Sequence, residues 1–154
     1  MGKVNHALSK TMLVTLNVAL QDALTTPHPV QLKNGLSLSY GSFISEDKPG
    51  VFTLHNLQNQ LATFSIQELP GCCGVAVSFY SEVDPTYREQ GIGELLLKVR
   101  MSAMRNQKYG SAICTTVNSN EIEKKMLRNA GWIKLYEFRN PKTNNIIETF
   151  SVNL

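Results

Sequence analysis

Arg88-Glu89-Gln90-Gly91-Ile92-Gly93, between an apolar stretch and an amphipathic one, decides the fold of this chain. Glycine lacks a Cβ atom, so Gly91 and Gly93 let an anion approach the main-chain N–H groups closely. The helical pattern that begins there adds unpaired N–H donors and the positive end of a helix dipole. The stretch therefore predicts a turn that binds a diphosphate.

Two familiar glycine-rich phosphate loops do not fit these letters. A Walker loop ends in Gly-Lys-Ser or Gly-Lys-Thr, whereas Gly93 is followed by Glu94 and Leu95. A dinucleotide fingerprint needs Gly or Ala three residues beyond Gly93, where this chain has Leu96. A tight strand-to-helix turn without any ligand remains the plain alternative.

The run Val83-Asp84-Pro85-Thr86-Tyr87, followed by Arg-x-x-Gly-x-Gly, resembles the acyl-CoA loop of the GNAT superfamily of N-acyltransferases. Asn120 stands eleven residues before the pair Gly131-Trp132, as the family's asparagine and its terminal glycine-aromatic pair are placed. The resemblance is specific over residues 72–132 and only topological before them.

This resemblance implies a fold class and a cofactor. It predicts one α/β domain over residues 1–154, built on a mixed, mostly antiparallel sheet that is splayed at the acyl-CoA strand, with helices on both faces. The strand that carries the loop would separate from its neighbour between residues 80–83 and 115–118. The implied acyl donor is acetyl-CoA.

Hydrophobic periodicity predicts an order of elements that agrees with this fold. Apolar residues at helical spacing mark a first helix near residues 8–24, and a turn is expected at residues 47–50. The other predicted elements are strands at 36–40, 51–54, 61–66 and 72–83, a helix from 92 to about 108, a strand at 111–117, a helix that follows Asn120 and stops at 129–131, and a hairpin of 133–138 with 146–152.

Composition limits the classes of protein. The chain has 154 residues, 42% hydrophobic, with a net charge of +3, so one core can form without metal or disulfide support. No segment is apolar enough to span a membrane, and no aromatic-basic motif indicates nucleic-acid binding. The three histidines show no metal-ligand spacing, so no metal is expected.

The cysteines and the basic residues carry two further expectations. The odd number of cysteines, with Cys72 and Cys73 adjacent and Cys114 distant, fits a reduced cytoplasmic protein in which each cysteine is a small buried residue in a strand. The basic residues of the second half are interpreted mainly as solvated helix faces, with one or two near the phosphates: Lys98, Arg100, Arg105, Lys108, Lys124, Lys125 and Arg128.

The resemblance assigns binding roles residue by residue. It implies that main-chain N–H groups from Glu89 to Glu94 hold the diphosphate, that Arg88 adds charge, and that the backbone near Val83 pairs with the pantetheine arm. Asn120 is also expected to cap its helix, with Glu123 three residues later. The predicted cofactor-binding residues are Val83, Arg88, Glu89, Gln90, Gly91, Ile92, Gly93, Glu94 and Asn120.

The implied reaction is direct attack by an amine on the thioester, and a protonated amine must first lose a proton to a base. Glu82 is the candidate base, helped by Ser78 and Tyr80 if all three share one face of the strand. A bulge, which is frequent in the family at this point, would change these directions.

One position departs from the family pattern. Many members carry a tyrosine four residues before the terminal glycine-aromatic pair, where it protonates the leaving thiolate, and this chain has Leu127 there. Tyr136, Ser119 or water could replace that phenol. A thiolate with a pKa near 8.5 needs little such help.

The function expected from these residues is transfer of an acetyl group to a primary amine, and a homodimer is one possible assembly. The alternative is a catalytically weak or inactive module of the same fold that binds CoA or interacts with another protein. The identity of the amine does not follow from the sequence.

Overall fold

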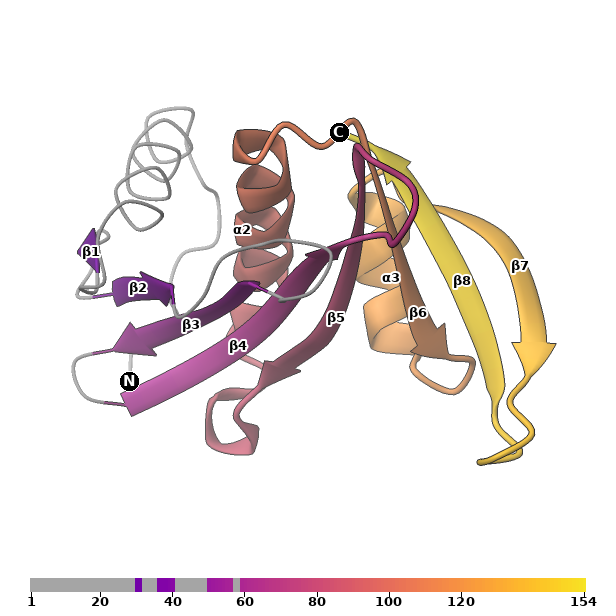
Figure 1. Cartoon of the computed structure of the whole chain (residues 1–154). Coiled ribbons are helices and arrows are strands. Elements are labelled where there is room, and N and C mark those ends of the chain that lie inside the picture. Colours follow the sequence, from indigo (N-terminus) through magenta and orange to yellow (C-terminus); the bar gives the residue numbers. More distant parts are fainter. Residues whose placement is uncertain (1–29, 32–35, 41–49, 57–58) are drawn as a thin grey trace.

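The computed structural model describes residues 30–31, 36–40, 50–56 and 59–154 (Figure 1). Its elements, in chain order, are β1 (Val30–Gln31), β2 (Leu36–Tyr40), β3 (Gly50–Asn56), β4 (Asn59–Glu68), β5 (Val75–Val83), the 3-10 helix η2 (Pro85–Tyr87), α2 (Ile92–Asn106), β6 (Ser111–Val117), α3 (Glu121–Asn129), β7 (Ile133–Arg139) and β8 (Ile146–Asn153). The helix predicted near residues 8–24 and the turn predicted at residues 47–50 lie outside the described residues.

The strands form one eight-stranded sheet in the order β1-β2-β3-β4-β5-β6-β8-β7. The β5–β6 pair is parallel and the other pairs are antiparallel, so the predicted mixed, mostly antiparallel sheet is confirmed. Both α2 and α3 lie behind the sheet in Figure 1. They approach closely, since a Cβ atom on Gly93 of α2 would lie 3.3 Å from Sδ of Met126 on α3.

The core fills the space between the sheet and α2. Alternation along β3 and β4 turns one row of side chains inward, and Phe52 stacks on Phe64 with ring centroids 4.7 Å apart. α2 is buried around most of its circumference, since every residue from Leu96 to Met104 except Lys98 is buried. The largest fully buried side chains are Trp132, Phe52, Phe64, Phe150, Leu38, Leu54, Ile66, Leu96, Met104, Leu127 and Val99.

The predicted strand at residues 72–83 begins too early. Gly71 and Gly74 both have positive φ and form a turn, so β5 starts only at Val75. Cys72 and Cys73 are therefore exposed turn residues, and the expectation that they are buried in a strand is wrong. The same expectation is confirmed for Cys114, which is buried in β6.

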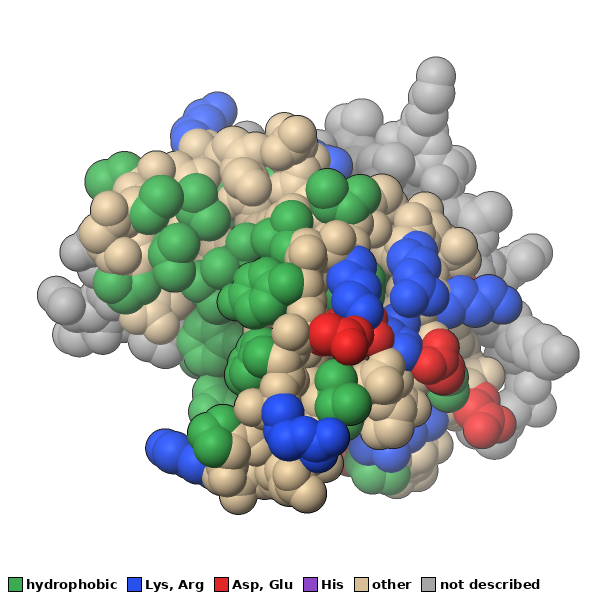
Figure 2. Space-filling model, turned by 90° about the vertical axis from the view of Figure 1, so that its right-hand side faces the viewer, with side chains coloured by type: hydrophobic (Ala, Val, Ile, Leu, Met, Phe, Trp, Pro, Cys, Tyr) green, Lys and Arg blue, Asp and Glu red, His purple; other side chains and the backbone are tan. Residues whose placement is uncertain are grey.

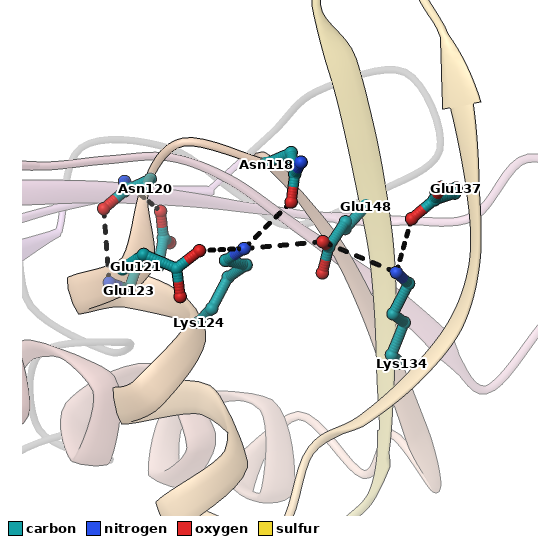
Figure 3. Close-up of polar contacts among 8 residues, drawn as sticks. All are labelled: Asn118, Asn120, Glu121, Glu123, Lys124, Lys134, Glu137 and Glu148. Atoms are coloured by element: carbon teal, nitrogen blue, oxygen red, sulfur yellow. Dashed lines mark hydrogen bonds and ion pairs between the residues drawn. The ribbon is translucent and has the colours of Figure 1, made fainter.

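A chain of polar contacts joins α3 to the C-terminal hairpin (Figure 3). Lys124 of α3 is only 3% exposed, and its Nζ donates to Asn118 Oδ1 at 2.9 Å and to Glu148 Oε1 at 3.4 Å. The carboxylate of Glu121 forms a third contact with this ammonium group. The prediction that Lys124 lies on a solvated face is wrong, because the last turn before α3 and the middle of β8 enclose its side chain.

The chain of contacts continues to the edge of the sheet. Lys134 on β7 lies 3.4 Å from the same Glu148 oxygen and 2.6 Å from Glu137 Oε2. The hydrogen bond from Lys134 lowers the pKa of Glu137 and raises that of Lys134. The buried Glu148 thus accepts from two cations on different elements.

β7 is an edge strand with exposed apolar side chains: Ile133, Leu135, Tyr136 and Phe138. Figure 2 shows hydrophobic side chains gathered on this side of the molecule, beside a group of acidic and basic ones. β7 offers an apolar edge to which a second copy of the chain could bind. The homodimer itself stays a prediction. Among the described residues, no helix has the length and apolar character that crossing a membrane requires.

Replacement of Lys124 by Met should lower the free energy of unfolding by about 3 kcal/mol, because it breaks a buried ion pair and leaves Glu148 underpaired. Lys125→Met, at the exposed neighbouring position, should stay within about 0.5 kcal/mol of the parent. Urea unfolding would measure both variants. Recovery of stability in the double variant Lys124→Met/Glu148→Leu is also expected, and equal stability of the two single variants would contradict the role of the pair.

Candidate functional site

β5 and β6 separate part-way along their length and form a fork. Only residues Val75–Val77 of β5 pair with Ser111–Ile113 of β6, although β5 continues to Val83 and β6 to Val117. In Figure 1 the two strands diverge below this point. The predicted splay is therefore confirmed, and it leaves main-chain groups of two neighbouring strands without a strand partner.

A bulge in β5 changes the directions of its side chains. Ser65 of β4 pairs with Phe79, but Thr63 pairs with Glu82, so β5 has one extra residue between these pairs. Tyr80, which lies in the bulge, has a φ of 50° and is 79% exposed. The register places Glu82 on the same face as Phe79.

The expectation that Ser78, Tyr80 and Glu82 share a functional face is consequently wrong. Ser78 pairs with the buried Ile66 of β4 and is itself buried towards α2, whereas Glu82 is exposed on the opposite face. A period of two predicts directions correctly only up to the extra residue. Glu82 stands without Ser78 beside it.

The loop after β5 is shaped by local signals. Asp84 caps η2, since its Oδ1 accepts from the N–H of Thr86 at 2.8 Å. Glu89 has a φ of 61° and Gly91 a φ of 78°, so the chain turns sharply twice before α2 begins at Ile92. Gly91 is needed for its positive φ, which costs a residue with a Cβ atom conformational energy.

The N-terminus of α2 offers donors to an anion. The main-chain bond from Leu95 N–H to the Gly91 carbonyl, at 3.2 Å, is the first of the helix. The N–H groups of the first helical residues, which include Gly93 and Glu94, have no intrahelical acceptor. The helix dipole adds positive potential at the same end. The order of elements thus places this end of α2 directly after the β5 arm of the fork.

The side chain of Arg88 turns back to the end of β5. Its Nε donates to the Val83 carbonyl at 3.2 Å, and its Nη2 lies 4.0 Å from Glu82 Oε1. Both charged groups are more than half exposed, so this ion pair contributes little to stability. The fold brings these three predicted site residues together, with the Val83 carbonyl already occupied.

Asn120 lies at the start of α3, on the other side of the fork. Its Oδ1 accepts from the N–H of Glu123 at 3.2 Å, so the predicted cap is confirmed. Glu123 Oε2 in turn accepts from Asn120 Nδ2 and from Thr116 Oγ1, each at 3.1 Å. Both polar atoms of the Asn120 amide therefore already have a protein partner.

Arg100 is buried, although the basic residues of the second half were predicted to lie mainly on solvated helix faces. It is 4% exposed, and burial lowers the pKa of its guanidinium, an effect that nearby Cys114 and Glu123 oppose. Leu96, Arg100 and Met104 follow one another at four-residue intervals along α2, and all three are buried. That spacing was the signal that could have revealed its burial.

Two positions bear on protonation of the leaving thiolate, and neither supplies a phenol beside the fork. Leu127, at the family's tyrosine position, is fully buried. Tyr136 lies on β7, which β8 separates from the β6 arm of the fork. Trp132 is buried just before β7.

No protein-family model and no curated protein matches the sequence. Among solved structures, an acetyltransferase from Bacillus subtilis in complex with CoA is similar at 8% identity and a TM-score of 0.64, over 77% of this chain and 99% of that one. The ribosomal-protein-S18-alanine N-acetyltransferase from Escherichia coli is similar at 17% identity and a TM-score of 0.60, over 95% and 90%.

The chain has the GNAT fold. The IAA acetyltransferase from Bacillus cereus is also similar, at 11% identity and a TM-score of 0.60, over 70% of this chain and 79% of that one. At these identities the likeness establishes the fold, while substrates and site roles rest on the residues of this GNAT-fold chain itself.

Cys114 should resist alkylation in the folded protein, because burial raises the pKa of its thiol to about 12 and keeps it protonated near neutral pH. At pH 7.5 iodoacetamide should modify Cys72 and Cys73, which are exposed, and leave Cys114 intact. Peptide mass spectrometry would locate the labels, and denatured protein serves as the control. Rapid native labelling of Cys114 would contradict its burial.

Proposed function

We propose that this protein is an acyl-CoA-dependent N-acyltransferase, with acetyl-CoA as the donor and a primary amine as the acceptor. The observation that carries the proposal is the fork of β5 and β6, which lies directly before a glycine turn and the free N-terminus of α2. A diphosphate fits the helix N-terminus, and an extended amide-containing arm fits unpaired strand edges.

Different residues of the site would bind different parts of the acyl donor. The N–H groups from Glu89 to Glu94 would hold the diphosphate, with Arg88 as a nearby cation. The arm would pair with the main chain near Val83, and Arg88 would then release the Val83 carbonyl that it now contacts. Asn120 would line the opposite side of the fork while it keeps its cap to Glu123.

The proposed reaction forms one bond and breaks one. The amine nitrogen attacks the thioester carbon, the new N–C bond forms, and the C–S bond breaks to release the CoA thiolate. Glu82 accepts the proton that the amine must lose, directly or through water. A thiolate leaves without a strong acid, so Leu127 in place of a tyrosine does not prevent turnover.

A second candidate is a module with this fold that binds CoA but turns over slowly or not at all. It is favoured by the buried Leu127 and by the exposed, Arg88-paired state of Glu82. Calorimetric titration with acetyl-CoA, combined with thiol release across a panel of amines, separates the two candidates. Tight binding without any thiol release would favour the module.

Gly91→Val should abolish stabilisation of the protein by CoA, because a β-branched residue cannot hold the φ of 78° that shapes the turn. Saturating CoA should raise the melting temperature of the parent by about 5 °C. Gly110→Ala, outside the loop, is the matched control, since its new methyl group would meet no atom closer than the Gly74 carbonyl oxygen at 4.0 Å. An unchanged melting temperature of the parent in CoA would refute the proposed cofactor.

Glu82→Gln should lower kcat by about 100-fold while the affinity for acetyl-CoA stays near that of the parent, because a general base is lost. The control is Glu68→Gln, which should keep full activity, because Glu68 lies at the end of β4 that pairs with Ala76, away from Glu82. Initial rates of thiol release against pH would show the loss of the acidic limb in the Glu82 variant. Full activity of that variant would exclude Glu82 as the base.

A further inference from the structure

Arg100 is a buried cation with an incomplete set of partners. Its Nη1 donates to Ser78 Oγ at 3.4 Å, a long hydrogen bond, and its buried Nε has no hydrogen-bond partner. Among the residues that the structure describes, no carboxylate lies within ion-pair distance of it. Of the five N–H donors of a guanidinium, the described residues thus account for one long hydrogen bond and leave the buried Nε–H unpaired.

Such a group is costly unless something compensates it. Removing a charge from water without a counter-ion is strongly unfavourable, and native proteins pair nearly all buried charges. Lys124 in the same fold shows the usual solution, with oxygen atoms of Asn118, Glu121 and Glu148 around its ammonium group. Arg100 has no comparable set among the described residues, which is the arrangement expected where a ligand supplies acceptors.

Arg100 lies at the closed end of the fork. Its partner Ser78 comes directly after Val77, the last residue of β5 that pairs with β6. Cys114, which comes directly after Ile113, the corresponding residue of β6, is buried as Arg100 is. The guanidinium is therefore located behind the vertex at which the two strands separate.

Glu123 is the nearest internal alternative as a counter-ion. Its Oε2 is engaged by the hydroxyl of Thr116 and the amide of Asn120, each at 3.1 Å. It influences the pKa of Arg100, yet the two charged groups form no ion pair. Glu123 thus balances part of the charge from a distance and does not satisfy the buried Nε–H of Arg100.

We propose that Arg100 binds a carboxylate at the far end of the donor's acyl chain, so that the preferred donor is the CoA thioester of a short dicarboxylic acid. This inference rests on the proposed function and replaces its acetyl group by a longer, anionic one. The guanidinium is the side chain best suited to a carboxylate, because its donors match both oxygens.

The order of sites along the fork places the acyl end near Arg100. The N-terminus of α2, proposed for the diphosphate, follows the open end of the fork at Val83. Ser78 pairs with Ile66 and Val83 with Ala62, which are four residues apart on β4, so the bulged segment of β5 spans about 13 Å at the rise of a strand. With the diphosphate at the open end and the arm along β5, the group beyond the thioester points to the vertex and its guanidinium.

The test compares CoA, butyryl-CoA and succinyl-CoA by calorimetric titration of the full chain. The two thioesters have acyl chains of four carbons and differ in the terminal carboxylate. Succinyl-CoA should bind about tenfold or more tightly than butyryl-CoA, as expected for charge-assisted hydrogen bonds. Equal affinity of the two would overturn the inference, while binding of CoA itself reports separately on the proposed function.

Variants assign the effect to the side chain. Arg100→Met should remove the preference for succinyl-CoA and leave the affinity for CoA unchanged, which also shows that the variant is folded. Arg105→Met, an exposed arginine on the same helix, should keep the preference. Arg100→Lys should retain only part of it, because an ammonium group lacks the paired donors. A preference that persists in Arg100→Met would overturn the assignment.

Discussion

The loss of pairing between β5 and β6 after three residue pairs is the constraint on which the proposed site depends. Beyond that point each of the two strands pairs only with its other neighbour, β5 with β4 and β6 with β8. β5 stays with β4 as far as the Ala62–Val83 pair, and the N–H of Asp84 then donates to the Leu61 carbonyl at 2.8 Å. β6 pairs with β8 along its whole length, from Ser111 to Val117.

The sheet therefore consists of two antiparallel blocks that meet along a short parallel seam. The bulge at Tyr80 strengthens this division, because an extra residue increases the local twist and bends β5 with its own block. Beyond the paired residues, the facing edges of β5 and β6 keep main-chain donors and acceptors that no strand satisfies. The proposed ligand, with amide groups along an extended arm, would supply what these edges lack, and the anion at its far end would meet the N-terminus of α2.

Local features of the sequence carried the parts of this architecture that could be predicted. The glycine turn, the start of α2 and the Asn120 cap depend on residues within a few positions of one another, so their letters are sufficient. The meander and the final hairpin follow from alternation and turn residues in the same way. Boundaries moved by a few residues where glycines with positive φ, such as Gly74, delayed a strand.

Tertiary packing determined the parts that could not be predicted. The bulge in β5 depends on its register with β4, and it reversed the side-chain directions expected for Glu82 relative to Ser78. The burial of Arg100 and Lys124 depends on which strands cover their helices, and charge alone suggested solvent for both. Composition describes a basic helix face, but only the neighbouring elements decide whether that face meets water.

The contrast between these two buried cations separates stability from function in this fold. Lys124 joins α3 to β8 and has acidic and amide partners, so its network holds the C-terminal block together. Arg100 lies where the two blocks part, and within the described part of the chain its hydrogen-bond partner is Ser78. Structural ion pairs are satisfied within the chain, whereas binding sites keep donors for their ligand. The unsatisfied cation is at the vertex of the fork, so the strand separation on which the proposed ligand site depends also lies beside a fixed charge.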